Sequence, residues 1–305
     1  MPIPKQRRNP RVALPFDPNP RVPKQALPTN ACDTHIHVFG PPHIFPYAQD
    51  RRYEPPAAPV EYYFQVQKIT GLTRAVVVQP TAHGTDNSAI LDAIAKSGGR
   101  MKGIANIDEK TSDDELARLK KGGIVGARFS LMEDRAGSQG AIEHALPRMQ
   151  ALGWSLDLHV DPKNFLAHEA FVRSLTITTV VDHMARCEPA DGIEHPAFLL
   201  LLDLLQRENF WVKIASVSKI SARNKVAELD PIPYADMLPL ARAVIATAPN
   251  RVIWGSDWPH GNTFELGTVP NEGDLLDFLA AAVPDQATWR KILVDNPSRL
   301  FGFDT

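Results

Sequence analysis

Two short polar segments near opposite ends of the chain carry the residue types of a hydrolytic site. Residues 33–37 read Asp-Thr-His-Ile-His, which places His35 and His37 two positions apart. On a β-strand, side chains at that spacing project from the same face. Residues 255–260 read Gly-Ser-Asp-Trp-Pro-His, and Asp257 follows an apolar run, as expected where a buried strand reaches the rim of a sheet. If the two segments meet, they supply the nitrogen and carboxylate donors of a zinc-type site.

Further polar residues follow other apolar runs. Six of the ten histidines lie at or close to predicted strand ends, whereas His43, His144, His168 and His195 do not and are interpreted as surface residues. We expect Asp33 to make a structural hydrogen bond. Asp182 directly precedes His183, so we expect it to point to the opposite face of its strand. The polar residues at or just beyond the strand ends are His35, His37, Gln79, Thr81, His83, Arg128, His159, His183, Lys213, Asp257 and His260.

The elements that must position these groups alternate along the chain. β-Branched runs predict eight strands, and the segments between them predict amphipathic helices, the pattern of parallel βαβ units. Eight such units predict a (β/α)8 TIM barrel, whose reactive groups sit at the carboxyl ends of the strands. The runner-up is an open doubly wound sheet, but no GxGxxG follows the first strand. The strands are predicted at 31–38, 74–79, 102–107, 125–129, 154–160, 178–182, 210–215 and 252–255, and the main helices at 86–96, 112–121, 141–152, 196–206 and 234–247.

Composition limits the classes of protein that remain. The 305 residues are 44% hydrophobic and 22% charged, with a formal net charge of −2. This balance is typical of a globular protein and gives no electrostatic case for nucleic-acid binding. No apolar stretch is long enough to span a membrane. Two cysteines without CxxC spacing indicate reduced core residues and a cytoplasmic protein.

Residues 1–30 are rich in proline, and we predict an arm strapped across the barrel or across a neighbouring subunit. Residues 31–305 then form one barrel domain. The long, proline-rich connection 39–73 is predicted to close over the site. A homodimer is possible. Two features suggest it: the arm, and a loop around Trp258 that we expect at the surface.

The motifs resemble the amidohydrolase superfamily, specifically its amidohydrolase-2 branch. The resemblance rests on Thr-His-Ile-His at 34–37, Val-Asp-His-Met at 181–184, Trp-Gly-Ser-Asp-Trp-Pro-His at 254–260 and Asn-Pro-Ser-Arg-Leu-Phe at 296–301. Within the branch, Phe-Gly-Pro at 39–41, Gln-Pro-Thr-Ala-His-Gly-Thr-Asp-Asn at 79–87 and His-Met-Ala-Arg at 183–186 are most similar to the 2-pyrone-4,6-dicarboxylate lactonase group. This resemblance implies a distorted (β/α)8 barrel. It also implies hydrolysis of a lactone that carries anionic groups, as a step in the breakdown of aromatic compounds.

The resemblance also implies roles for individual residues. Asp257 matches the catalytic aspartate, and His183 matches the histidine of the sixth strand. One position departs from the lactonase group: this chain has His159 where that group has a tyrosine. The lactonase group works without a metal. Metal-dependent members of the branch use a histidine there. The residues expected to bind substrate are Tyr53, Thr81, Arg128 and Arg186, with Lys219 or Arg223 near a further anion-binding arginine, and His83 and His260 close by.

These assignments predict a mechanism. A single divalent metal, zinc, bound by His35, His37, His159 and Asp257 would activate water, and Asp257 would carry the proton to the leaving oxygen. His183 and Thr81 would donate hydrogen bonds to the oxyanion, and Arg128, Arg186 and Lys219 would hold substrate anions. Without metal, the histidines must polarise the carbonyl directly. The alternatives are a metal-dependent decarboxylase of an aromatic or muconate-type acid, a sugar-acid lactone isomerase, and a non-catalytic scaffold.

Overall fold

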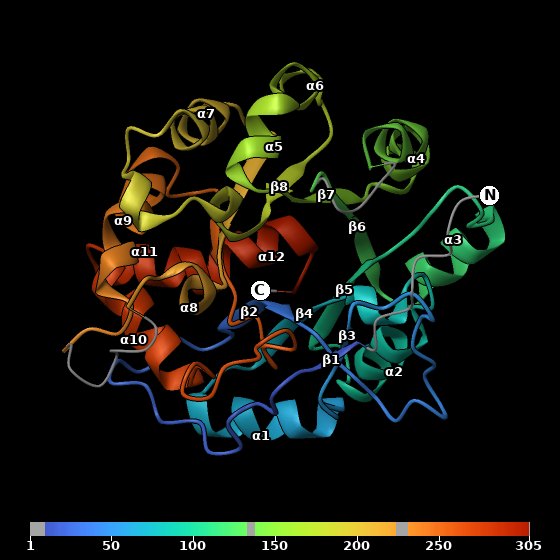
Figure 1. Cartoon of the computed structure of the whole chain (residues 1–305), viewed down its shortest axis with the longest axis horizontal. Helices are drawn as coiled ribbons and strands as arrows, with labels where there is room; N and C mark the ends of the chain where they lie inside the picture. The colour runs from blue at the N-terminus through green and yellow to red at the C-terminus, as the bar shows by residue number, and fades with distance from the viewer. Residues whose placement is uncertain (1–9, 133–137, 224–230, 305) are drawn as a thin grey trace, which may run out of the picture.

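Eight parallel strands form the centre of the protein (Figure 1). The computed structural model describes residues 10–132, 138–223 and 231–304. Each strand pairs with the next one along the chain, and every predicted strand is confirmed to within three residues at either end. The strands are β2 (Cys32–Ile36), β4 (Arg74–Val78), β5 (Met101–Ala105), β6 (Ile124–Ser130), β7 (Ser155–His159), β8 (Thr179–Val181), β9 (Phe210–Ile214) and β10 (Val252–Trp254).

The barrel is closed by the segment that follows β10. The Asp257 N–H donates to the His35 carbonyl at 2.8 Å, and the His37 N–H donates to the Trp258 carbonyl at 2.7 Å. The Thr34 hydroxyl also donates to the Trp254 carbonyl at 2.7 Å. The two polar segments singled out in the sequence therefore form the seam of the barrel, and the predicted TIM-barrel class is confirmed.

Helices surround the strands, and several of them, such as α2 with its buried Ala89, Ile90, Ala93 and Ile94, bury an apolar face. Ser112 caps α3, its Oγ accepting from the Glu115 N–H at 3.2 Å. The helix predicted at 234–247 begins only at Leu238, because Tyr234 has a left-handed backbone (φ 54°) that interrupts it. The helices are α1 (Val60–Thr70), α2 (Ser88–Lys96), α3 (Asp113–Lys121), α4 (Ser138–Leu152), α5 (Pro162–Ala167), α6 (Glu169–Ser174), α7 (Pro196–Leu204), α8 (Val217–Ile220), α9 (Leu238–Thr247), α10 (Glu272–Ala282), α11 (Gln286–Arg290) and α12 (Asn296–Phe301).

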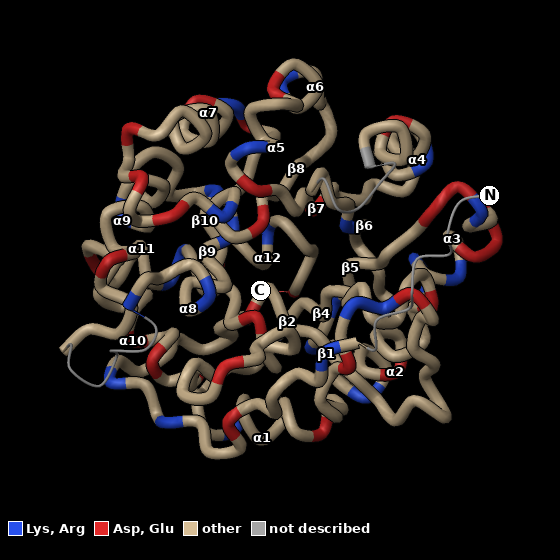
Figure 2. Tube along the Cα trace, viewed as in Figure 1, with Lys and Arg blue, Asp and Glu red and all other residues tan. Residues whose placement is uncertain are grey.

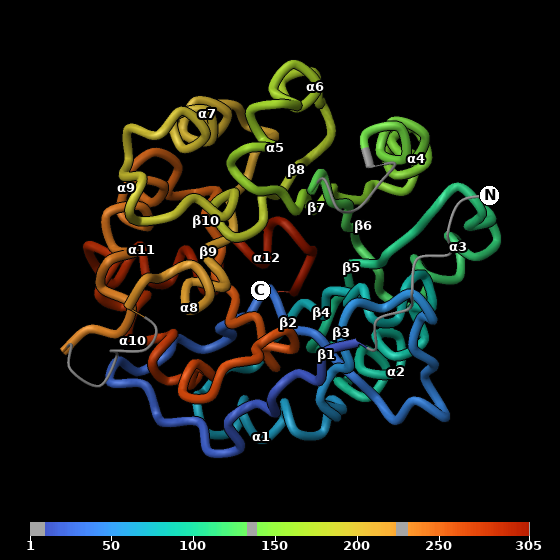
Figure 3. Tube along the Cα trace, in the orientation of Figure 1, coloured from blue at the N-terminus to red at the C-terminus, as the bar shows by residue number. Residues whose placement is uncertain are grey.

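The described part of the N-terminal arm, residues 10–30, lies against its own barrel; residues 1–9 lie outside the described residues. Its first strand, β1 (Arg11–Val12), pairs in parallel with β3 (Tyr53–Glu54). Further on, the Arg21 N–H donates to Asn271 Oδ1 at 2.8 Å. The arm, blue in Figure 3, thus runs beside the orange and red C-terminal part of the chain.

The Trp258 side chain is fully buried, contrary to the surface loop we expected. It packs between Phe16 of the arm and Tyr63 of α1, with ring centroids at 5.0 and 5.3 Å. This loop therefore gives no hint of a dimer. Cys32 and Cys187 are both buried and free, as predicted. Acidic and basic residues are interspersed around the molecule (Figure 2). Among the described helices, none has the length and apolar character needed to cross a membrane.

Candidate active site

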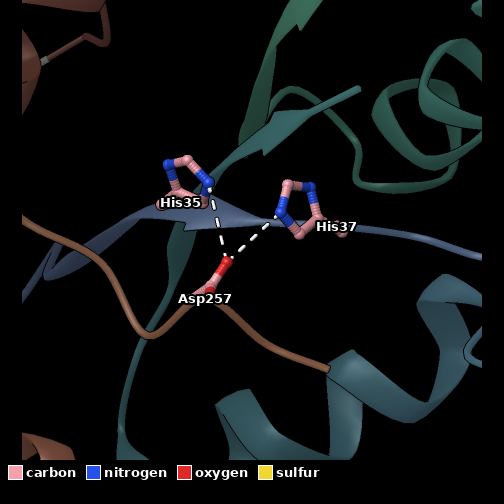
Figure 4. Close-up of side chains that lie close together, drawn as sticks. All are labelled: His35, His37 and Asp257. Atoms are coloured by element: carbon pink, nitrogen blue, oxygen red, sulfur yellow. Dashed lines mark ion pairs between the residues drawn. The ribbon is translucent and has the colours of Figure 1, made fainter. Parts of the chain in front are cut away.

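His35, His37 and Asp257 meet at the seam of the barrel (Figure 4). Asp257 Oδ1 lies 3.2 Å from His37 Nε2 and 3.7 Å from His35 Nε2. His35 is fully buried and Asp257 nearly so. The two chain segments picked out by residue type therefore form one cluster.

Asp33 holds the two halves of this cluster together. Its Oδ1 accepts from the N–H groups of Ser256 at 2.9 Å and His35 at 3.1 Å, and its Oδ2 accepts from the Tyr63 hydroxyl at 3.0 Å. Gly255 is needed at the same crossing, because a Cβ there would lie 2.5 Å from the His35 Cβ. Burial raises the pKa of Asp33 to about 6, although these hydrogen bonds oppose the shift. Asp33 makes the structural hydrogen bonds that we predicted.

The orientation of His37 is fixed by one backbone contact. Its Nδ1 lies 2.8 Å from the Val78 carbonyl oxygen, which can only accept. Nδ1 therefore carries a proton, and Nε2 is the atom that meets the Asp257 carboxylate. A lone pair facing a carboxylate oxygen at 3.2 Å needs a proton or a cation between the two atoms.

A buried ionic network lies beneath His35. Lys213 Nζ lies 2.8 Å from Asp157 Oδ2, 3.0 Å from Asp182 Oδ1 and 3.1 Å from His35 Nδ1. All four side chains are fully buried. Burial alone would lower the pKa of Lys213, but the two carboxylates outweigh it and raise that pKa. His35 has a pKa well below its usual value because of its burial and the nearby ammonium group, so the imidazole is neutral.

Asp182 points into the barrel, which corrects our expectation that it would face away. Asp182 lies two residues after Val180, which faces the barrel interior, so its orientation continues the alternation of β8. From His183 to Arg186 the backbone is left-handed, with φ between 51° and 55°. The departure from alternation is at His183, which this turn leaves facing the cavity. Arg128 Nε donates to Asp182 Oδ2 at 2.8 Å.

The second oxygen of Asp257 is held by two donors. Lys219 Nζ lies 2.6 Å from Oδ2, and the Ser216 hydroxyl donates to the same atom. Burial by itself would raise the pKa of Asp257, but Lys219 and the contact with His37 hold that pKa well below its usual value. Asp257 is therefore a carboxylate at neutral pH, with Oδ1 directed at the histidines.

His183 and His159 extend the cluster. The His183 ring lies 4.8 Å from the His35 ring and 5.8 Å from the His159 ring, measured between centroids. Burial lowers the pKa of His183 to about 3, so its imidazole is neutral at physiological pH. His159 ends β7, as predicted, and its Nδ1 lies 3.3 Å from the Ser130 hydroxyl.

A cavity of about 340 Å³ opens above Asp257. Its size lies near the lower end of the range for small-molecule sites. Most of the residues proposed from the sequence line it: Tyr53, Thr81, Arg128, Arg186, Lys219, His37, His159, His183 and Asp257. His35 lies behind Asp257, fully buried.

Three proposed substrate-binding residues do not line this cavity. His83 is turned away, with its Nδ1 3.0 Å from the Pro46 carbonyl oxygen. His260 is buried, with its Nε2 3.1 Å from Glu272 Oε1. Arg223 is exposed beyond α8. A position near a strand end in the sequence thus did not guarantee access to the cavity. His260, for example, has a left-handed backbone (φ 61°), and its side chain points to Glu272 of α10.

The sequence also left several lining residues unassigned. Arg11 comes from the arm, Arg52 directly precedes β3, and Phe264 lies in the loop after the closing segment. Ser216 follows the end of β9 and has a left-handed backbone (φ 55°). Of these lining residues, it is the one that a search of strand ends for hydroxyl groups could have found. The charged residues of the arm gave no local signal of their destination.

The donor set fits a metal ion. Among the described residues, donor atoms within 4.8 Å of one another occur in two groups, His35–His37–Asp257 and His35–Asp182–His183. Ligands 2.0–2.1 Å from a tetrahedral ion lie about 3.3 Å apart, close to the 3.2 and 3.7 Å separations at Asp257. His35 Nε2 is buried without a hydrogen-bond partner. His159 belongs to neither group.

Comparison with known proteins agrees with this geometry. A sequence model of the family described as Amidohydrolase matches residues 32–303. The chain is 38% identical to the 4-sulfomuconolactone hydrolase of Hydrogenophaga intermedia (90% of each chain) and 36% identical to the 2-pyrone-4,6-dicarboxylate hydrolase of Comamonas testosteroni (93% of each). It also superposes, with a TM-score of 0.73 and 28% identity, on a solved structure of a probable 2-pyrone-4,6-dicarboxylic acid hydrolase from Acinetobacter baumannii with citric acid bound. That match covers 90% of this chain and all of the other.

Proposed function

This chain belongs to the amidohydrolase family, and on that premise we propose that it is a hydrolase that opens the lactone ring of a small molecule with several anionic groups. One observation carries the proposal. Asp257 is a carboxylate set between imidazoles at the base of a cavity that five cationic side chains line: Arg11, Arg52, Arg128, Arg186 and Lys219. Such a site combines a proton acceptor with binding groups for anions.

Substrate anions are bound by the guanidinium groups of Arg128 and Arg186. The Nε of Arg128 donates to Asp182, and Arg128 also lines the cavity. Thr81 and the neutral His183 also line the cavity and offer donors to the carbonyl oxygen as it gains charge. The substrate carbonyl is placed between these donors and Asp257.

Asp257 moves the proton. Its Oδ1 takes a proton from the attacking water as the new C–O bond forms, and returns that proton to the ring oxygen when the ester bond breaks. Lys219 and Ser216 hold Oδ2 throughout. The products are one new carboxylic acid and one alcohol or enol, so the atoms of water and lactone are all accounted for.

We propose a single divalent ion, zinc, as the cofactor. His35, His37 and Asp257 would hold it, and His159 is proposed as a further ligand from the same cavity wall. When bound, zinc would supply Lewis acidity in the cavity. Binding through Nε2 requires the His35 proton on Nδ1, which lies 3.5 Å from Asp182 Oδ1 and 3.1 Å from Lys213 Nζ. The N–H groups of Lys213 must then point to Asp157 and Asp182 and not to His35.

The test is a panel of lactones with one, two or three anionic groups, including 4-sulfomuconolactone and 2-pyrone-4,6-dicarboxylate, followed by proton release and by product analysis. Elemental analysis of the same preparation measures zinc. We expect ring opening of anionic lactones and about one zinc per chain. Release of carbon dioxide, or an isomerised lactone without net ring opening, would contradict the proposal.

A further inference from the structure

The N-terminal arm brings a cation to the mouth of the cavity. Arg11 lies on β1, whose parallel pairing with β3 places it opposite Tyr53. The next residues continue the attachment, because the Ala13 N–H donates to the Glu54 carbonyl at 2.9 Å and the Leu14 N–H to the Thr263 carbonyl at 2.8 Å. Backbone hydrogen bonds thus fix where Arg11 enters the rim.

Arg11 has an orienting contact at this rim. Its Cζ lies 4.1 Å from the centre of the Phe264 ring, over the ring face. The Phe264 ring in turn packs edge-to-face on Tyr53, with centroids 6.4 Å apart at 80°. A guanidinium held over an aromatic face keeps its N–H donors available at its edge. Within the described part of the chain, no carboxylate pairs with Arg11, and its side chain is exposed.

The cations deeper in the cavity are placed differently. Arg128 is bonded to Asp182 and Lys219 to Asp257, so each is partly neutralised by a carboxylate. Arg186 is mostly buried, and burial lowers its pKa. One anionic group beside Arg186 and Arg128 satisfies this inner set and leaves the charge of Arg11 unmatched.

We propose that Arg11, together with the neighbouring Arg52 that also lines the cavity, forms a second anion subsite at the mouth of the cavity, separate from the inner set of Arg128, Arg186 and Lys219. The arm is then part of the binding site as well as a strap across the barrel. The lactone character of the ligand rests on the proposed function, whereas the anion subsite does not depend on turnover.

The experiment measures binding without catalysis. Citrate, with three carboxylates, and benzoate, with one, are titrated calorimetrically into the wild-type protein and into Arg11→Ala. We expect the Kd for citrate to rise about tenfold in Arg11→Ala, the loss of one charge-assisted hydrogen bond of about 1.4 kcal/mol. The Kd for benzoate should stay as in the wild type. Added salt should reduce the difference, because the group is exposed.

Arg21→Ala is the matched control. Arg21 lies on the same arm, is exposed, and pairs with Asp274 away from the cavity. The Arg21→Ala variant removes one positive charge, as Arg11→Ala does, and should leave the affinity for citrate unchanged. Arg11→Gln, which keeps the length of the side chain, replaces Arg11→Ala if that variant does not fold.

Three results would overturn the inference: no citrate binding by the wild type, equal losses for citrate and benzoate, or the same loss in Arg21→Ala. Failure of the proposed function is a separate result. In that case no lactone is opened, while the citrate difference between Arg11→Ala and Arg21→Ala persists.

Discussion

Replacing Lys213 with methionine should destabilise the protein in a pH-dependent way. The substitution keeps the length of the side chain but removes the cation from a network whose members are fully buried. Asp182 keeps its ion pair with Arg128 at 2.8 Å, whereas the ion pair shown for Asp157 is the one with Lys213. The variant therefore leaves one buried carboxylate uncompensated, a change that typically costs about 3–5 kcal/mol.

The pH dependence follows from the direction of the shift. Burial raises the pKa of Asp157 even with Lys213 present, and loss of the ammonium group raises it further. A native state with a raised carboxyl pKa binds a proton that the unfolded chain releases. The free energy of unfolding contributed by this group therefore falls as pH rises from about 3.9, the unfolded pKa, to the native pKa, by about 1.4 kcal/mol per pH unit.

The assay is urea unfolding followed by tryptophan fluorescence at pH 5 and pH 8, which the five tryptophans make practicable. Lys213→Met should lose more stability at pH 8 than at pH 5, relative to the wild type. The double variant Lys213→Met/Asp157→Leu should recover much of the loss, since an apolar replacement removes the unpaired charge. A single variant as stable as the wild type at pH 8, or a cost independent of pH, would refute this account of the network.

Three further predictions concern the site. Asp257→Asn should lower kcat by about 10²–10⁴-fold, the usual contribution of a general base, with an unchanged circular dichroism spectrum; an active variant would remove Asp257 from its assigned role. Because Lys219 and His37 hold the pKa of Asp257 well below its usual value, kcat/KM should not fall on the acid side until below about pH 4, where an unperturbed aspartate would titrate. A fall centred near pH 6 would assign the limb to another group. Dialysis against dipicolinate should remove zinc and activity together, and zinc should restore both; full activity in metal-free protein would contradict the cofactor proposal.

Several features of this protein were predictable from local sequence. The eight strands follow from short apolar, β-branched runs bounded by polar and turn residues, because burial in a parallel sheet requires them. The position of His35, His37 and His159 at strand ends follows from the same runs. The structural role of Asp33 was predicted as well, since a buried carboxylate at the start of a strand needs donors nearby.

Other features were decided only in three dimensions. Asp182 and His183 both face the interior because the alternation of β8 ends at the left-handed His183, and nothing in the residue types marks that turn. The same kind of backbone turn directs His260 to Glu272 rather than to the cavity. Arg11 reaches the mouth because its strand pairs with β3, more than 40 residues further along the chain. The periodicity of apolar residues predicts the helices and strands because each element buries its own apolar face. The pairing between distant segments, and therefore the partners of Asp182 and Arg11, depends on the assembled barrel.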